Sequence, residues 1–397
     1  MQIALKVWSG VLGVPDRRRF ALAQLEWIDA STEQFVALAK NWLEAAQVMP
    51  EGDLRRIHLL QALDEAFHCI DFLKPGSPAF YSSISQALAC LRERQAAFEK
   101  IDEDRPLITG IGHAHIDVAW LWRIKHSREK AARSFSTALH LMRQYPDYAF
   151  LHSSPQLYQY LKQDYPELYA RVKERIAQGR WEIDGGMWVE ADTNLTSGES
   201  LVRQLLYGKR FVCEEFAKEM DTLWLPDVFG YSGALPQIMK KSGIKRFLTT
   251  KISWNQFNRF PYDTFLWRGL DGSEVLTHFV TTPDPGAKFY TYNGQLSAGE
   301  IQGIWENYQQ KEVNDELLLL FGWGDGGGGP TREMLDSAQA LRGLPGMPRV
   351  QLGRAGDYFE RLEERVSGKP LPVWDGELYL ELHRGTYTSQ AANKRAN

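Results

Sequence analysis

Short apolar runs alternate with amphipathic helical patterns from Leu107 onward, and this alternation constrains the fold more than any other feature of the chain. The runs that we expect to form strands are 107–113, 148–152, 181–184, 222–226, 246–250 and 316–321. Helical patterns at 125–144, 155–178, 199–219, 235–241 and 332–341 follow most of these runs. Parallel neighbouring strands need long crossover connections, which helices usually provide. The order therefore predicts an α/β fold with a parallel sheet, open or closed into a barrel.

The region before Leu107 has a different pattern. Residues 15–100 read as helical, because apolar side chains recur at helical spacing within 53–70 and again within 85–98. The acidic, proline-containing stretch 102–106 separates this region from the alternating pattern. We therefore expect a helical segment over 1–104 and an α/β domain over 105–370.

Composition argues against several classes of partner. The chain of 397 residues has a formal net charge of −4, with 44% hydrophobic and 24% charged residues, as in an ordinary globular protein. This charge gives no reason to expect nucleic acid or an anionic membrane as partner. The N-terminus has no apolar region of secretory type, and no stretch approaches membrane-spanning length. Cys69, Cys90 and Cys213 lie far apart without a C-x-x-C pattern, which fits a reducing compartment. We expect a cytoplasmic protein.

Two histidines and an aspartate follow the first apolar run, as His113, His115 and Asp117. Strand side chains alternate between faces, so residues at i, i+2 and i+4 point the same way. Neutral imidazole and carboxylate are ligands of a zinc-like ion, and Trp120 adds a flat apolar face beside them. The pattern predicts a metal site at this strand end; the alternative is a pair of hydrogen-bonded histidines.

Two more carboxylates follow other strand candidates. Asp227 comes after 222–226, and Asp325 comes after 316–321 in a glycine-rich segment. Because the carboxyl ends of parallel strands meet at one edge, we expect these residues to converge on the first motif. Asp227 alone also fits a helix N-cap. The glycine-rich segment lacks the Lys-Ser/Thr of a phosphate-binding loop. The carboxylates of 188–194 fit a pocket wall and structural hydrogen bonding equally.

A metal with two extra carboxyl groups allows two kinds of chemistry. Two carboxyls that flank a bond are what glycoside hydrolysis needs, since one protonates the leaving oxygen and the other attacks or activates water. A metal also polarises a carbonyl or makes hydroxide for the hydrolysis of an amide or ester. The residues alone leave both open.

Four motifs in this order decide between them by resemblance: 113–122 (H-x-H-I-D-x-A-W-L-W), 185–192 (G-G-x-W-V-E-x-D), 225–232 (L-P-D-x-F-G-Y-S) and 321–330 (F-G-x-G-D-G-G-G-G-P). From about residue 105 the chain resembles the family 38 α-mannosidases of the cytosolic and bacterial branch, which are zinc-dependent retaining glycosidases. The resemblance implies a seven-stranded barrel-like catalytic domain with parallel strands. It also implies hydrolysis of terminal α-D-mannosyl residues from mannosides or oligomannose oligosaccharides, zinc or else cobalt as cofactor, and a possible homo-oligomer.

The resemblance also implies roles for single residues. His115 and Asp117 match two zinc ligands, and Asp227 matches the residue that ligates zinc and acts as nucleophile. Asp325 matches the general acid/base. In a retaining enzyme the two carboxyls stand about 5–5.5 Å apart.

Four further positions match residues around the sugar or the metal. Trp120 looks like the aromatic floor beneath the sugar, and Lys251 falls where relatives carry a cation near the nucleophile. His383 sits where relatives place a pocket-lining aromatic residue. His113 is not a ligand in the family pattern and is better read as a neighbour of the ligands.

One departure concerns the last metal ligand. The family takes it from a His-Asp pair in a helical domain beyond the barrel, and this sequence contains no His-Asp dipeptide. Residues 371–397 look like the start of that helical domain, so we expect a truncated chain with an incomplete metal site. A metal-dependent carbohydrate deacetylase is an alternative, but its H-x-x-x-H ligand pair is absent. A non-catalytic sugar-binding remnant is the other alternative.

Overall fold

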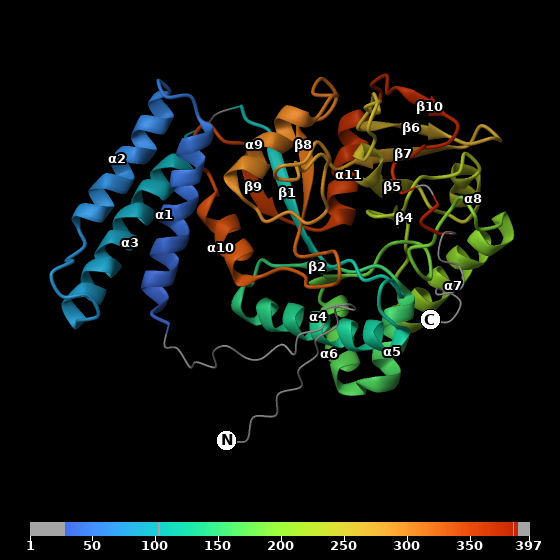
Figure 1. The fold of residues 1–397 in the computed structure, drawn as a ribbon, viewed down its shortest axis with the longest axis horizontal. Coiled ribbons are helices and arrows are strands. Elements are labelled where there is room, and N and C mark those ends of the chain that lie inside the picture. Colours follow the sequence, from blue (N-terminus) through green and yellow to red (C-terminus); the bar gives the residue numbers. More distant parts are fainter. Residues whose placement is uncertain (1–27, 102–103, 384, 388–397) are drawn as a thin grey trace.

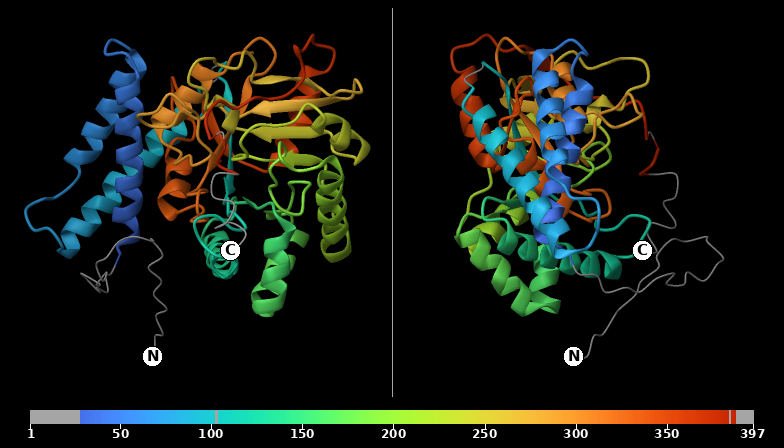
Figure 2. Two further views of the ribbon diagram at one scale, coloured as in Figure 1. Left: turned by 45° about the vertical axis from the view of Figure 1, so that its right-hand side comes forward. Right: turned by 90° about the vertical axis from the view of Figure 1, so that its left-hand side faces the viewer.

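Three antiparallel helices form a layer beside the rest of the molecule in the computed structural model, which describes residues 28–101, 104–383 and 385–387. The helices are α1 (Ala30–Val48), α2 (Leu54–His68) and α3 (Pro78–Phe98). Figures 1 and 2 show them in blue at one side of the α/β part. The buried Trp42 of α1 donates from Nε1 to the carbonyl of Ala340 at 3.1 Å, which fixes this layer to the α/β part.

Each of the three helices begins at a residue suited to cap it. The side chains of Asp29, Asp53 and Ser77 accept hydrogen bonds from backbone N–H groups in the first turns of α1, α2 and α3. Such caps satisfy N–H groups that have no partner within the helix. The helical character expected within 53–70 and 85–98 is present as α2 and α3.

The strands of the α/β part form two sheets of five strands each. The first has the order β3-β2-β1-β8, with β9 also paired to β1; the second has the order β10-β6-β7-β5-β4. Among the strands of the described residues, only β6 and β7 pair in antiparallel fashion. The strands of the first sheet are β1 (Leu107–His113), β2 (Phe150–Leu151), β3 (Trp181–Glu182), β8 (Glu316–Phe321) and β9 (Arg349–Leu352). Those of the second are β4 (Thr222–Trp224), β5 (Arg246–Thr249), β6 (Thr264–Arg268), β7 (Glu274–Phe279) and β10 (Val373–Asp375).

The predicted α/β class with a parallel sheet is confirmed, whereas the seven-stranded barrel is not. Among the described residues, backbone pairing joins the strands into two separate sheets. The edge strands β3 and β4 have only two and three residues, so few backbone groups are available to extend either sheet.

One hydrophobic cluster lies between the two sheets. It contains Ile111 and Leu320 from the first sheet and Trp224 and Leu248 from the second, all nearly or fully buried. The helix α11 (Ala355–Val366) contributes its apolar face to the same cluster and lies between the sheets in Figure 1. Because both sheets bury side chains in one core, they keep a fixed relation without a shared backbone ladder.

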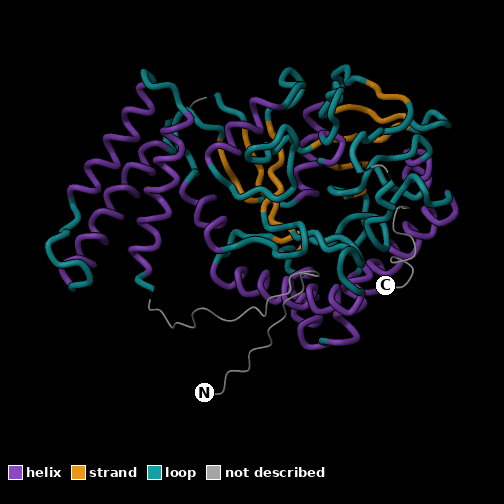
Figure 3. Tube along the Cα trace, viewed as in Figure 1, coloured by secondary structure: helices purple, strands orange, loops and turns teal. Residues whose placement is uncertain are grey.

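The remaining helices flank the strands, and long loops join the two kinds of element (Figure 3). They are α4 (Ile124–Gln144), α5 (Pro155–Asp164), α6 (Pro166–Ala177), α7 (Gly198–Phe216), α8 (Leu235–Lys241), η1 (Lys251–Ser253), α9 (Ala298–Asn307) and α10 (Arg332–Ala340). Among the described residues no helix combines the length and the apolar character that a membrane span requires.

The segment 371–397 contains a strand where the start of a helical domain is expected from the sequence. Residues 373–375 form β10, which pairs with β6. Trp374 packs on Phe260 with ring centroids 4.6 Å apart, and Trp267 Nε1 donates to the carbonyl of Gly376 at 2.7 Å. These contacts hold the segment against the second sheet. Residues 384 and 388–397 lie outside the described residues.

Candidate active site

The polar residues singled out in the sequence follow the carboxyl ends of parallel strands from both sheets. His113 is the last residue of β1, and His115 and Asp117 lie in the loop that follows it. Asp227 follows β4, Lys251 begins η1 directly after β5, and Asp325 follows β8. The structure brings His115, Asp117 and Asp227 together although Asp227 comes from the other sheet.

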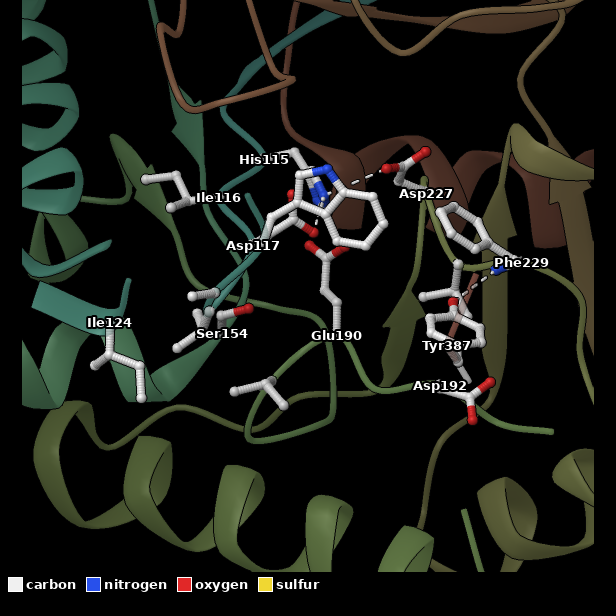
Figure 4. A pocket seen from close by; sticks show the side chains of 15 residues that line it. His115, Ile116, Asp117, Ile124, Ser154, Glu190, Asp192, Asp227, Phe229 and Tyr387 are labelled. Carbon is white, nitrogen blue, oxygen red and sulfur yellow. Dashed lines mark hydrogen bonds and ion pairs between the residues drawn. The ribbon is translucent and has the colours of Figure 1, made fainter. Parts of the chain in front are cut away.

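His115, Asp117 and Asp227 form a compact cluster of potential metal ligands. One ligand atom from each residue lies within 4.8 Å of the other two. His115 Nε2 is 3.3 Å from Asp117 Oδ1 and 3.7 Å from Asp227 Oδ2. Figure 4 shows these carboxylates gathered around the imidazole ring.

The His115 ring is buried, and its Nε2 makes no hydrogen bond within the described part of the chain. Burial by itself lowers the pKa of His115, but the carboxylates of Glu190 and Asp117 outweigh it and raise this pKa well above its usual value. The surroundings therefore favour positive charge beside Nε2. One imidazole nitrogen and two carboxylate oxygens are a donor set that suits zinc or a similar divalent ion.

Lys251 compensates the charge of Asp227 on the side away from His115. Its ammonium group donates to Asp227 Oδ1, and the Lys251 side chain is only 5% exposed. The same ammonium lies 3.8 Å from the ring centroid of Trp254 and 5.0 Å from that of Phe229. A cation between two aromatic faces is stabilised there without a hydration shell.

Asp325 faces the same cleft from the glycine-rich loop. Asp227 and Asp325 both line a cavity of about 580 Å³ that also contains Trp120, Trp254 and His383. Burial, and next the negative charge of Asp227, raise the pKa of Asp325 above its usual value. The two carboxyls thus share a cavity, and Lys251 donates a hydrogen bond to Asp227 within it.

Aromatic rings form the walls of this cleft. The Trp120 and Phe229 rings meet edge to face with centroids 6.2 Å apart, and His383 lies over Phe229 at 4.6 Å. His383 also lies 5.5 Å from Trp254. His383 is not part of the cluster formed by the three potential ligands. The walls therefore offer apolar faces close to the polar cluster.

His113 lies beneath the cluster and does not join it. The His113 ring is buried, its Nε2 lies 2.6 Å from the carbonyl oxygen of Tyr292, and burial lowers its pKa to about 4. The Tyr292 ring in turn meets the His115 ring edge to face at 5.4 Å. His113 thus supports a segment that packs against His115.

Sequence reasoning did not assign Glu190, Tyr292, Trp254 or Asn293 to the site. Glu190 lies in the stretch 188–194, whose carboxylates fitted a pocket wall and structural hydrogen bonding equally well from the sequence. Tyr292 and Asn293 come from irregular sequence with no strand or helix pattern. Asn293 Oδ1 accepts from the backbone N–H of Asp325 at 2.8 Å. No spacing rule connects two residues whose contact depends on the path of a loop.

Residues 106–377 match the family model described as Glycosyl hydrolases family 38 N-terminal domain. The chain is 47% identical over 295 residues to alpha-mannosidase G of Dictyostelium discoideum, which is 74% of this chain and 26% of that protein. It is 46% identical over 337 residues to alpha-mannosidase 2C1 of Mus musculus, which is 85% of this chain and 31% of that protein. The chain thus spans about a third or less of the length of these relatives.

The fold of this chain is also similar to that of a solved structure. An alpha-mannosidase from Enterococcus faecalis V583 superposes with a TM-score of 0.57 at 19% identity, covering 69% of this chain and 31% of that chain. At this identity the likeness concerns the fold alone.

Proposed function

The chain belongs to glycosyl hydrolase family 38, and from this premise we propose that it carries the active site of an α-mannosidase that hydrolyses terminal α-D-mannosyl residues. The observation that carries the proposal is the pair Asp227 and Asp325, which line one cavity: Lys251 donates to Asp227, and the pKa of Asp325 is raised. Pairs of carboxyls whose environments separate their proton affinities divide into a nucleophile and an acid.

The proposed roles follow from those surroundings. Lys251 donates to Oδ1 of Asp227 and orients this carboxylate, which attacks the anomeric carbon of the sugar. The pKa of Asp325 is raised above its usual value, which suits this carboxyl to deliver a proton to the leaving glycosidic oxygen. Asp325, now ionised, then takes a proton from the water that cleaves the glycosyl ester on Asp227. Two displacements at one carbon retain the configuration.

A divalent metal is the proposed cofactor, zinc first and cobalt as the alternative. His115, Asp117 and Asp227 would hold it, which is supported by their mutual distances and by the unpartnered Nε2 of His115. When bound, such an ion acts as a Lewis acid that polarises and orients sugar hydroxyl groups.

The aromatic walls are proposed to bind the sugar. Trp120, Trp254 and His383 line the cavity that contains both carboxyls. Pyranose rings present apolar C–H faces that pack on such side chains, while the polar groups at the cavity floor set the orientation. Mannosides or oligomannose oligosaccharides are therefore the proposed substrates.

The decisive experiment follows the hydrolysis of p-nitrophenyl α-mannoside by proton NMR in the presence of Zn²⁺ or Co²⁺. We expect α-mannose as the first product, and no turnover by the Asp227→Asn variant. β-Mannose as the first product overturns the two-step route. Absence of turnover combined with release of acetate from an acetylated sugar favours a deacetylase instead.

A further inference from the structure

Glu190 contacts the edge of the His115 ring that faces away from the ligand cluster. Glu190 Oε2 lies 2.9 Å from His115 Nδ1, and this carboxylate is 10% exposed. Both atoms are buried, and within the described part of the chain neither makes a hydrogen bond to any other residue. Glu190 is also outside the group of three potential ligands. Its carboxylate is therefore placed to act on the ring and not on the ion.

Ser153 holds Glu190 in this position. Ser153 Oγ donates to Glu190 Oε1 at 2.5 Å, and Ser153 is buried. Ser153 follows β2, while Glu190 follows β3, so the three residues come from three neighbouring strands of one sheet. A Cβ at Gly185, which has φ +138°, would lie 2.7 Å from the Ser153 Cβ. Glycine at this position therefore leaves the space that Ser153 occupies.

An imidazole binds a metal through one nitrogen only when its proton sits on the other. A carboxylate at Nδ1 holds the proton there, fixes the ring orientation and makes Nε2 a stronger donor. We propose that Glu190, braced by Ser153, is a positioning residue that presents His115 Nε2 to the metal. The inference rests on the metal site proposed above and adds a residue to its support.

The first experiment measures binding of Zn²⁺ and Co²⁺ to the metal-free protein by competition with a chromogenic chelator. We expect Glu190→Ala to weaken both affinities about 10–100-fold. Glu190→Gln keeps an oxygen acceptor but loses the charge, so we expect a smaller loss. Ser153→Ala, which frees the carboxylate, should change the affinities in the same direction. Thermal melts of the metal-free variants identify those that fold. If Glu190→Ala does not fold, Glu190→Gln and Ser153→Ala still test the inference.

The second readout is the proton NMR spectrum of the Co²⁺-loaded protein. A bound imidazole keeps its other N–H close to the paramagnetic ion, so this proton gives a strongly shifted resonance that disappears in D₂O. We expect one such resonance in the wild-type protein and its loss through fast exchange in Glu190→Ala. A merely structural role for Glu190 leaves this resonance in place.

Asp192 supplies a matched control on the same loop. Its carboxylate accepts from the backbone N–H groups of Asn194 and Leu195, and within the described residues no hydrogen bond or ion pair joins it to His115. Asp192→Asn removes one negative charge from the region and should leave both metal affinities unchanged. If Asp192→Asn loses as much metal affinity as Glu190→Ala, the effect of Glu190 comes from the negative charge of the region alone, and the inference is overturned.

The remaining outcomes separate the inference from the function. A wild-type protein that binds neither metal overturns the metal site and the inference with it. A wild-type protein that binds metal, beside a Glu190→Ala variant with equal affinity and the same shifted resonance, overturns the inference alone.

Discussion

Asp227 and Asp325 are the same residue type in one cavity, and their neighbours give them different chemistry. Asp227 accepts a hydrogen bond from the buried ammonium of Lys251, which orients its carboxylate. Asp325 makes no such hydrogen bond to a cation among the described residues, and partial desolvation of its carboxyl and the charge of Asp227 raise its pKa. The sequence identifies both aspartates through their place after strands. Their division of roles depends on neighbours that only the folded chain supplies.

The loss of activity on removing the proposed acid should depend on the leaving group of the substrate. Asp325→Asn cannot protonate the glycosidic oxygen, so we expect kcat/KM on an unactivated mannoside to fall about 10²–10⁴-fold. On p-nitrophenyl α-mannoside, whose leaving group needs little protonation, the loss should be far smaller. Steady-state kinetics on the two substrates check this. Equal losses would place the acid/base role on another residue, whereas Asp227→Asn should abolish turnover of both.

At the scale of elements, the conformation of the loop after β8 depends on the residues that pack against it. Gly327 has φ +80°, and a Cβ there would lie 2.5 Å from Ile116 Cγ1. Lys130 Nζ donates to the carbonyl of Gly326 at 3.0 Å, so α4 fixes the same loop from the outside. The sequence reveals a flexible, glycine-rich segment. Contact with Ile116, in the loop after β1, explains why position 327 needs glycine.

A methyl group at position 327 should therefore be costly. Gly327→Ala combines an unfavourable φ with the overlap on Ile116, and we expect the free energy of unfolding to fall by at least about 2 kcal/mol. Activity should fall as well, since this loop carries Asp325. Thermal or urea unfolding measures the change. Gly299→Ala is the control, because its Cβ meets no atom within 4 Å and the position lies in α9.

The control variant should behave in the opposite way. Alanine has a higher helix propensity than glycine, so Gly299→Ala should leave stability unchanged or raise it by up to about 1 kcal/mol. If both variants have the same midpoint of urea unfolding as the wild-type protein, the loop is not constrained by Ile116.

At the scale of the whole molecule, α11 connects the two sheets. Arg361 of α11 pairs with Glu316 at the start of β8, with Arg361 Nη2 2.6 Å from Glu316 Oε1. Glu363 of the same helix accepts from Arg246 at the start of β5, at 2.8 Å. These ion pairs lie at the strand ends opposite the candidate site. The helix therefore joins sheets that share no backbone ladder, and the relation between Asp117 and Asp227 depends on that junction.

Loss of one of these pairs should destabilise the junction. Glu316 is fully buried, and although Arg365 and Thr109 still contact it, Arg361→Met removes its bidentate partner. We expect a loss of about 1–3 kcal/mol in the free energy of unfolding, measured by urea titration. Arg210→Met is the control, since Arg210 and Glu214 form an exposed pair on α7 that contributes little. Similar losses in both variants would contradict a special role for the junction.

The sequence by itself indicated β1, β2, β3, β4, β5 and β8 and the helices that follow most of them, but not β6, β7, β9, β10, α9 or α11. Periodicity of apolar residues places the strands and helices, and the order of motifs indicates the family, because both are properties of neighbours along the chain. The helical region before Leu107 and the parallel character of the sheet follow from the same local patterns.

Only the tertiary structure decided how these elements close and which side chains meet. It shows two sheets around a shared core and does not confirm the expected seven-stranded barrel, and it places β10 where a helical start is expected. It also brings Glu190 and Ser153 to His115 from two other strands. Contacts between residues far apart in sequence depend on the summed packing of the whole chain, which no local pattern encodes.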